Sequence, residues 1–128
     1  MKILVTGVNG QLGEQIVNIC PPEYSLLKTT RDDLDLSKPK DCYEYVLEIK
    51  PNWIINAGAY TAVDKAESEK DTAFKVNAEA PKAFTEALKI TGGRMLQLST
   101  DFIFGGNTTN FHKIDDIPNP INYYGFSK

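Results

Sequence analysis

The chain has 128 residues, a formal net charge of −3, 41% hydrophobic residues and 24% charged residues. This size and composition are typical of one globular domain and argue against disorder and against two full domains. Its apolar stretches are far shorter than the ~20 residues of a bilayer span, and the N-terminus lacks the apolar core of a signal peptide. We therefore expect no membrane segment and a cytoplasmic location. A pI near 5.1 without clustered basic residues argues against a nucleic-acid partner.

The two cysteines and the single histidine offer little for disulfide or metal chemistry. Cys20 and Cys42 fall at apolar positions of helical patterns, where a free thiol packs as a small hydrophobic group. His112 has no second nitrogen or thiolate near it in the sequence. We therefore expect no metal site.

The first half of the chain alternates β-branched runs with helical patterns. Residues Lys2 to Thr6 and Tyr24 to Thr30 predict two strands. Gln11 to Cys20 predicts a helix that Pro21 ends, with one apolar face made by Leu12, Ile16, Ile19 and Cys20. Ser37 is the expected N-cap of a second helix, which continues until Pro51.

The second half continues the alternation. Trp53 to Ala57 is apolar on successive residues, which is typical of a parallel strand covered on both faces, and Arg94 to Leu98 predicts another strand. A long helical region from about Ala62 to Ile90 lies between them, and Gly105 to Pro120 predicts a long loop. Strands that alternate with helices indicate right-handed βαβ units. The predicted fold class is therefore α/β, a Rossmann-like doubly wound parallel sheet.

Three glycines follow the first predicted strand and open the first helix with the spacing G-x-x-G-x-x-G. Glycine allows a tight turn, close approach of the backbone to a pyrophosphate, and close packing of helix on strand. The helix N-terminus then offers free N–H groups to the phosphates. In this context we predict dinucleotide binding by the residues of the turn, which are Gly7, Asn9, Gly10, Gln11, Leu12 and Gly13.

The tip of the second strand bears on the choice of cofactor. An acidic residue there would bond the 2′-hydroxyl of NAD, but this chain has Thr30, Arg31 and Asp32. Arg31 could clamp a 2′-phosphate with the help of the Thr30 hydroxyl, whereas Asp32 would repel it. This favours NADP(H), with NAD(H) as the alternative. In the other interpretation, Arg31 is a solvated side chain that pairs with Asp32 and Asp33.

Tyr124 and Lys128 are four residues apart and share one face of a helix. A lysine ammonium near a phenol favours the phenolate and lowers a pKa that starts near ~10, which makes the tyrosine a usable acid at neutral pH. Ser99 and Thr100 follow the last predicted strand, and Asn56 to Ala59 follow the strand before it. Open α/β sheets bind their ligands at these carboxyl ends.

Asn77 lies on an otherwise apolar stripe of the long helical region, so its amide must find partners inside the protein. Pro81, four residues later, has no N–H, and its ring clashes with the carbonyl of Asn77. We therefore expect the main-chain oxygen of Asn77 to be released from the helix ladder.

Together these residues resemble the extended short-chain dehydrogenase/reductase family. Segments 60–67, 99–104 and 120–125 are similar to the branch that reduces nucleotide-linked keto sugars, and the resemblance covers essentially the whole chain. It implies that NADPH reduces the 4-keto group of a nucleotide-linked deoxysugar. Tyr124 would protonate the carbonyl oxygen, Thr100 would hydrogen-bond it, and Lys128 would hold the nicotinamide ribose. Asn77 would support a proton relay through water to the lysine.

The resemblance also implies cofactor contacts outside the glycine turn. Asp35 and Leu36 would line the adenine pocket, although they serve equally well as a turn that leads into a helix. Gly58 replaces the alanine usual in the family motif, which we expect to give more room. The full set of implied cofactor-binding residues outside the turn is Arg31, Asp35, Leu36, Asn56, Ala57, Gly58, Tyr60, Ser99, Tyr124 and Lys128.

Family members continue through further strands and a C-terminal sugar-nucleotide domain. The resemblance therefore implies that residues 1–128 are an incomplete NADP-binding Rossmann domain. We expect this chain alone to bind the cofactor weakly, to lack activity, to fray at Tyr124 and Lys128, and to associate through an open sheet edge.

Two alternatives to this function are another nucleotide-sugar reductase or epimerase, and a non-catalytic NADP-binding regulatory subunit. Intact Tyr124 and Lys128 argue against the second, because a pure binder needs no activated phenol. The expected partners are a nucleotide-sugar substrate and, in a homodimer, a second copy of the chain.

Overall fold

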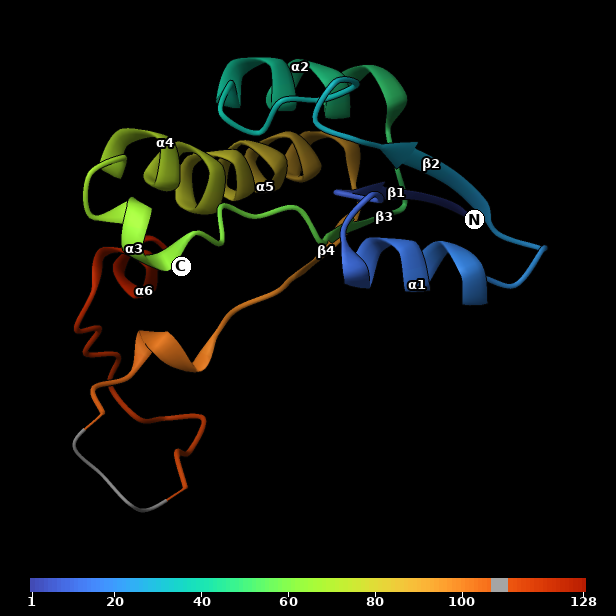
Figure 1. Ribbon diagram of the computed structural model, residues 1–128. Coiled ribbons are helices and arrows are strands. Elements are labelled where there is room, and N and C mark those ends of the chain that lie inside the picture. Colours follow the sequence, from blue (N-terminus) through green and yellow to red (C-terminus); the bar gives the residue numbers. More distant parts are fainter. Residues whose placement is uncertain (107–110) are drawn as a thin grey trace.

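In the computed structural model, which describes residues 1–106 and 111–128, helices cover both faces of a parallel sheet (Figure 1). Its described strands are β1 (Lys2–Thr6), β2 (Ser25–Thr29), β3 (Trp53–Asn56) and β4 (Arg94–Gln97), in the order β2-β1-β3-β4. Every pairing is parallel, and β1 pairs with both β2 and β3. The predicted α/β class with a doubly wound sheet is confirmed.

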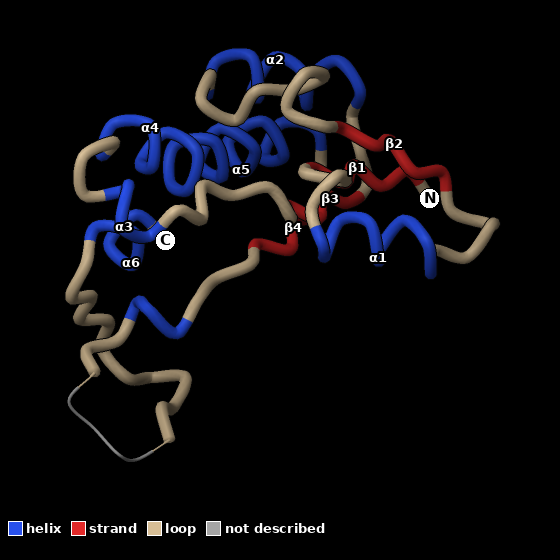
Figure 2. Tube along the Cα trace, in the orientation of Figure 1, coloured by secondary structure: helices blue, strands red, loops and turns tan. Residues whose placement is uncertain are grey.

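The longer helices lie on opposite faces of this sheet. Helix α1 (Gln11–Ile19) lies on one face, and α2 (Pro39–Ile49) and α5 (Ala80–Thr91) lie side by side on the other (Figures 1 and 2). The core forms under α2 and α5, where Leu4, Ile54 and Phe84 are fully buried. Each such side chain contributes about 1.5–3 kcal/mol relative to an exposed one.

The predicted apolar face of the first helix is only partly covered. Leu12 is 44% exposed and Ile19 is 76% exposed, whereas Ile16 is half-buried. Cys20 is the C-cap of α1 rather than a residue of its last turn. In the described part of the chain no second helix packs beside α1 on this face (Figure 1). Helical periodicity therefore identifies the apolar stripe of α1, but much of this stripe stays exposed.

The start of α2 differs by one residue from the expected N-cap. Lys38 occupies the N-cap position and Pro39 the first turn, where the fixed φ of proline suits a helix. The Ser37 N–H instead donates to Asp35 Oδ1 at 2.9 Å. Ser37 therefore belongs to the turn that precedes the helix.

The long helical region is divided into four parts. They are α3 (Val63–Ala66), α4 (Lys70–Phe74), a π-helical turn (Lys75–Glu79) and α5. In the π turn the Ala80 N–H donates to the Lys75 carbonyl, five residues earlier. Pro81 follows immediately and has no N–H to donate. The helical hydrogen bonds therefore change from the α to the π pattern in the place where the sequence predicts a disturbed helix.

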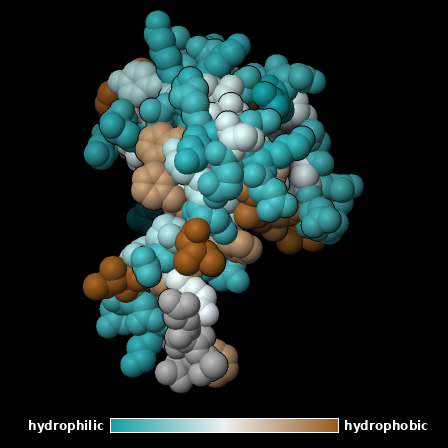
Figure 3. Space-filling model, turned by 60° about the vertical axis from the view of Figure 1, so that its left-hand side comes forward, coloured by the Kyte–Doolittle hydropathy of each residue, from teal (hydrophilic) through white to brown (hydrophobic). Residues whose placement is uncertain are grey.

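After β4 the chain leaves the sheet (Figure 2). It forms a short 3₁₀ turn (Asp101–Ile103), passes through a loop, and returns to α6 (Tyr123–Ser127), which packs beside α3. The loop predicted for Gly105 to Pro120 is confirmed where it is described, and residues 107–110 lie outside the described residues. Figure 3 shows apolar side chains on the surface here, and Phe111, Ile114, Ile117 and Ile121 are strongly exposed.

Within residues 1–106 and 111–128, no helix has the length and apolar character needed to cross a bilayer.

Candidate functional site

The glycine turn between β1 and α1 packs backbone against backbone. Gly7 has φ 64°, a left-handed value that favours glycine. A Cβ at Gly7 would lie 2.7 Å from the Gly58 Cα, and a Cβ at Gly13 would overlap the carbonyl oxygen of Gly7. The Gly10 N–H donates to that same oxygen at 3.0 Å. These close approaches explain why the turn needs glycine at both ends.

The turn presents the N-terminus of α1 without a side-chain cap. Gly10 is the N-cap, and no side chain within the described residues caps the first turn of the helix there. The exposed residues Gln11 and Leu12 follow it. A helix start of this kind has N–H groups and a positive dipole end available for an anion.

A cavity of about 380 Å³ lies beside the turn at the carboxyl edge of the sheet. Its walls come from the β1–α1 turn, the segment after β2, the segment after β3, and α4 with the π turn. It lies where the connections that follow the neighbouring strands β1 and β3 lead to opposite sides, toward β2 and β4, which is the usual ligand position in open α/β sheets. The lining residues are Gly7, Asn9, Thr30, Arg31, Leu34, Asp35, Leu36, Gly58, Ala59, Tyr60, Glu69, Thr72 and Val76.

The structure thus brings together several residues that the sequence assigns to the cofactor. Of the residues predicted outside the turn, Arg31, Asp35, Leu36, Gly58 and Tyr60 line this cavity. Glu69, Thr72 and Val76 were missed, because no local pattern marks them and only the packing of the helical region carries them to the cavity.

The expectation of more room at Gly58 is wrong. A Cβ there would lie 2.7 Å from Leu36 Cδ1 and 3.3 Å from Thr6 Oγ1. The Leu36 side chain therefore already fills the space that a missing methyl group leaves.

Arg31 is free to meet a ligand at the rim of the cavity. Its side chain is 78% exposed, and its Nε lies 3.8 Å from Asp35 Oδ1, a weak surface pair. Asp33 is instead bonded by the N–H and the hydroxyl of Thr30, both at 2.8 Å, which hold the pKa of its carboxyl below the usual value. The Thr30 hydroxyl therefore has its proton engaged within the protein, and the described ion pairs of Arg31 do not include Asp32 or Asp33.

Asn56, at the end of β3, has its side chain inside the protein. It is 1% exposed; it accepts from Thr6 Oγ1 at 2.5 Å and donates to Gln97 Oε1 at 2.7 Å. Thr6 Oγ1 in turn accepts from the Gly58 N–H at 3.1 Å. This network holds the segment of Ala57 and Gly58 against β1. Asn56 therefore supports the wall of the cavity without lining it.

The amide of Asn77 finds partners, as the sequence predicts. Asn77 is 4% exposed. Its Oδ1 accepts from the Tyr60 N–H at 2.9 Å, and its Nδ2 donates to the Tyr60 carbonyl at 3.0 Å and to Ser127 Oγ at 2.9 Å. Asn77 therefore connects the segment after β3 with α6.

Thr100 precedes the 3₁₀ turn and Tyr124 lies in α6, and these two elements are in contact. Thr100 caps the 3₁₀ turn, and its Oγ1 accepts from the Phe102 N–H at 3.3 Å. The Tyr124 ring packs edge-on against Phe102, with centroids 5.7 Å apart. A Cβ at Gly125 would overlap the Phe102 carbonyl oxygen, so glycine lets α6 approach this turn. Ser99 is exposed and does not line the cavity.

Helix α6 has hydrogen-bonded anchors at its N-terminus, and the expected fraying at Tyr124 and Lys128 stays a prediction. Asn122 caps it by accepting from the Gly125 N–H at 2.7 Å, and Glu67 Oε1 accepts from the Tyr123 N–H at 2.7 Å. Lys128 follows the helix and is half-buried, and this burial lowers the pKa of its ammonium.

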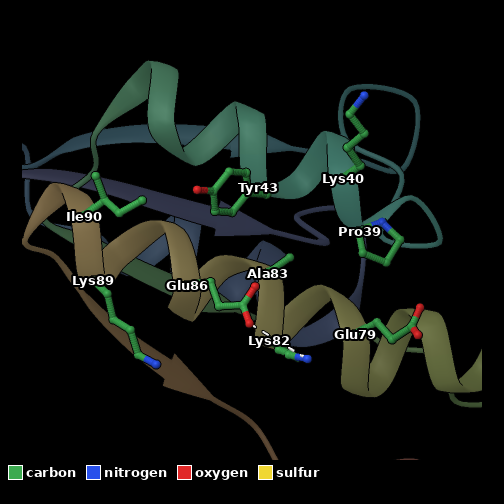
Figure 4. A pocket seen from close by; sticks show the side chains of 9 residues that line it. All are labelled: Pro39, Lys40, Tyr43, Glu79, Lys82, Ala83, Glu86, Lys89 and Ile90. Carbon is green, nitrogen blue, oxygen red and sulfur yellow. Dashed lines mark ion pairs between the residues drawn. The ribbon is translucent and has the colours of Figure 1, made fainter.

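A larger hollow of about 720 Å³ lies between α2 and α5, away from all of these residues (Figure 4). Charged side chains surround it, including the Lys82–Glu86 ion pair at 3.9 Å. None of the residues predicted for the site lines it. Burial raises the pKa of the nearby Cys42 thiol to about 12, so it is an inert core group. Among the described residues no cluster of potential metal ligands forms.

The strand order, the glycine turn and the cavity at the carboxyl edge define a Rossmann-like fold. Residues 1–128 match the family described as the RmlD substrate binding domain, and the chain belongs to this family.

The chain is similar to curated reductases over less than half of their length. It is 40% identical over 128 residues to the dTDP-4-dehydrorhamnose reductase of Burkholderia thailandensis, which covers 100% of this chain and 43% of that protein. It is 36% identical over 132 residues to the enzyme of the same name from Escherichia coli K12, again over 100% of this chain and 44% of that protein.

Solved structures give the same relationship. The dTDP-4-dehydrorhamnose reductase of Clostridium acetobutylicum superimposes with a TM-score of 0.93 at 38% identity, over 99% of this chain and 46% of that one. The Bacillus anthracis enzyme, solved in complex with NADP, superimposes with a TM-score of 0.92 at 35% identity, over 98% of this chain and 45% of that one. A UDP-glucose 4-epimerase from Thermus thermophilus, at 20% identity and a TM-score of 0.83 over 100% and 47%, shares the fold.

Proposed function

We propose that the full gene product carrying this chain reduces the 4-keto group of dTDP-4-dehydro-L-rhamnose with NADPH and forms dTDP-L-rhamnose. The observation that carries the proposal is the link from the cavity at the glycine turn to the main chain of Tyr124 through Asn77 and Ser127. The relatives named dTDP-4-dehydrorhamnose reductase support the choice of sugar. Residues 1–128 would form the NADP-binding part, with the sugar nucleotide held largely by residues outside it.

The residues of the cavity fit such a cofactor. The glycines of the Gly7 to Gly13 turn allow close backbone packing, and the turn leads into the N-terminus of α1, where the N-cap Gly10 has no side chain. Arg31 would bind the 2′-phosphate, and Asp35 and Leu36 would line the adenine site. The NADP complex of the Bacillus anthracis relative supports this assignment.

The remaining chemistry falls to the residues around α6. When bound, NADPH supplies a hydride to the carbonyl carbon. Tyr124 would donate its phenolic proton to the carbonyl oxygen, and Thr100 would donate a hydrogen bond to the same atom. Lys128 would hold the nicotinamide ribose and favour the ionised phenol by its charge. Asn77 would support proton supply to the lysine, because the Pro81 ring leaves its carbonyl without an α-helical donor.

The test is to incubate the full gene product with NADPH and dTDP-4-dehydro-L-rhamnose and to follow the absorbance of the reduced nicotinamide. We expect its loss in step with the appearance of dTDP-L-rhamnose by chromatography. Unchanged absorbance with this sugar, but turnover with a different keto sugar nucleotide, would favour the alternative of another reductase or epimerase. Cofactor binding without turnover of any sugar would favour the regulatory subunit. The homodimer, the cytoplasmic location and the inactivity of this chain alone stay predictions.

Cofactor choice gives a separate prediction, centred on Arg31. Arg31→Ala is expected to remove a preference for NADPH over NADH of about 1.5–3 kcal/mol, because charge-assisted hydrogen bonds to the 2′-phosphate are lost. Titration of both cofactors into the parent and the variant measures the ratio of the two Kd values. Arg94→Ala is the control, since it removes the same charge from the far end of β4. An unchanged ratio in Arg31→Ala would show that this residue does not bind the phosphate.

A further inference from the structure

Ser127 is a buried hydroxyl to which neither the sequence motifs nor the proposed chemistry assigns a role. It is 2% exposed and lies between the proposed acid and the proposed lysine on α6. Its Oγ donates to the Tyr124 carbonyl at 2.7 Å and accepts from Asn77 Nδ2 at 2.9 Å. The hydroxyl therefore joins α6 to a residue of the π turn.

The orientation of the Asn77 amide makes this connection directional. Its two N–H groups donate to the Tyr60 carbonyl and to Ser127 Oγ, and its oxygen accepts from the Tyr60 N–H. In the reversed orientation the amide oxygen would face the Tyr60 carbonyl, and two acceptors would oppose each other. The amide is therefore fixed by Tyr60, and it holds the Ser127 hydroxyl in turn.

The other hydrogen-bonded anchors that the structure describes for α6 lie at its opposite end, whereas ring packing of Phe126 on Phe74 and of Tyr124 on Phe102 adds apolar contacts along it. Asn122 caps the N-terminus, and Glu67 binds the N–H of Tyr123, the first residue of the helix. A five-residue helix has little stability of its own, so its orientation depends on such contacts. The bond from Asn77 to Ser127 is the buried one, and it lies next to Lys128.

These contacts form a continuous path from the cavity wall to the proposed acid. Tyr60 lines the cavity together with Gly58 and Ala59, and its main chain is bonded to Asn77, which is bonded to Ser127. We propose that Ser127 is a positioning residue that fixes Tyr124 and Lys128 relative to the cofactor-binding wall. This inference rests on the proposed function. It does not make Ser127 a catalytic residue, because its hydroxyl is bonded to Tyr124 and Asn77.

The test compares Ser127→Ala with Ser68→Ala in the full gene product. Ser68 is the matched control, because its Oγ also donates to the carbonyl three residues earlier, at 3.1 Å, but it is exposed. Ser127→Ala is expected to lower kcat about 10- to 100-fold, as small displacements of reacting groups do, with the Kd for NADPH changed less than about threefold. Ser68→Ala should leave both unchanged, and Ser127→Thr, which keeps the hydroxyl, should recover most of kcat.

Several results would overturn the proposal. The first is a kcat for Ser127→Ala within about twofold of the parent value. The second is a decrease of kcat in Ser127→Ala that is no larger than the decrease in Ser68→Ala. The third is an equal decrease of kcat in Ser127→Ala and Ser127→Thr. If Ser127→Ala does not fold, Ser127→Thr and Ser127→Cys are compared instead, because a thiol is a weak hydrogen-bonding group. Equal kcat values in these two variants would also overturn it.

A second measurement separates this inference from the proposed function. Amide hydrogen exchange over residues 123–128 is expected to become about tenfold faster in Ser127→Ala and not in Ser68→Ala. This readout needs no turnover. A parent without reductase activity would therefore defeat the proposed function alone, whereas unchanged exchange in Ser127→Ala would defeat the positioning role.

Discussion

Replacing Tyr124 by phenylalanine is expected to lower kcat for keto-sugar reduction by about 10²–10⁴-fold, the usual contribution of a general acid. The change removes the phenolic proton but keeps the ring that packs against Phe102. The helix and its anchors at Asn122 and Ser127 should therefore remain in place. Steady-state kinetics give kcat and KM, and a fluorescence titration gives the Kd for NADPH, which should stay within about twofold of the parent.

The neighbouring tyrosine provides the matched control for this experiment. Tyr123 lies on the same helix. The centroid of its ring is 5.4 Å from that of the Phe126 ring and 5.2 Å from the Lys70 Nζ. Tyr123→Phe removes an identical hydroxyl from a position without a proposed catalytic role. Equal activity of Tyr124→Phe and Tyr123→Phe would show that Tyr124 is not the acid.

Replacing Gly13 by alanine is expected to weaken NADPH binding by at least about tenfold and to destabilise the fold by about 1–3 kcal/mol, the usual cost of overpacking. The added Cβ would overlap the Gly7 carbonyl oxygen and would also lie 2.8 Å from the Val8 Cα. Backbone atoms cannot rotate away as the end of a side chain can, so the turn itself must move. Binding is measured by titration, and stability by chemical unfolding.

Two other glycines of the chain make this a graded series. A Cβ at Gly10 would lie 3.3 Å from the Gly7 oxygen, a tight contact, and a Cβ at Gly106 would meet none of the residues that the structure describes within 4 Å. We expect a strong effect for Gly13→Ala, a weaker one for Gly10→Ala and none for Gly106→Ala. If Gly13→Ala binds NADPH as the parent does, the turn does not hold the pyrophosphate.

The fold could be predicted from sequence because its signals are local. The apolar runs at Ile3 to Val5 and Trp53 to Ile55, each followed by turn or helix residues, are enough to place neighbouring parallel strands. Pro81 likewise marks the disturbed helix around Asn77 through chemistry that needs no tertiary information. Helical periodicity identified the stripe of Leu12 and Ile19, but it could not tell whether another element covers that stripe.

The candidate site was predictable only where a motif carries it. The spacing of the glycines and of Tyr124 and Lys128 is visible in the sequence. Glu69 and Ser127 are ordinary helical residues by sequence, and they gain their significance from the partners that folding brings to them. The Tyr60 hydroxyl donates to Glu69 Oε2 at 2.7 Å, and this bond raises the pKa of the phenol. Such a contact between a segment that follows a strand and a later helix leaves no pattern in the sequence.

The contact between Leu36 and Gly58 couples the side-chain volumes of two positions that lie far apart in the chain. The tip of the leucine occupies the volume that a methyl group at position 58 would need. Alanine at position 58 should therefore be compatible with a shorter or differently turned residue at position 36, and glycine with leucine. Alanine at position 58 alone would require the Leu36 side chain to turn away, and a shorter residue at position 36 alone would leave a hole in the wall of the cavity.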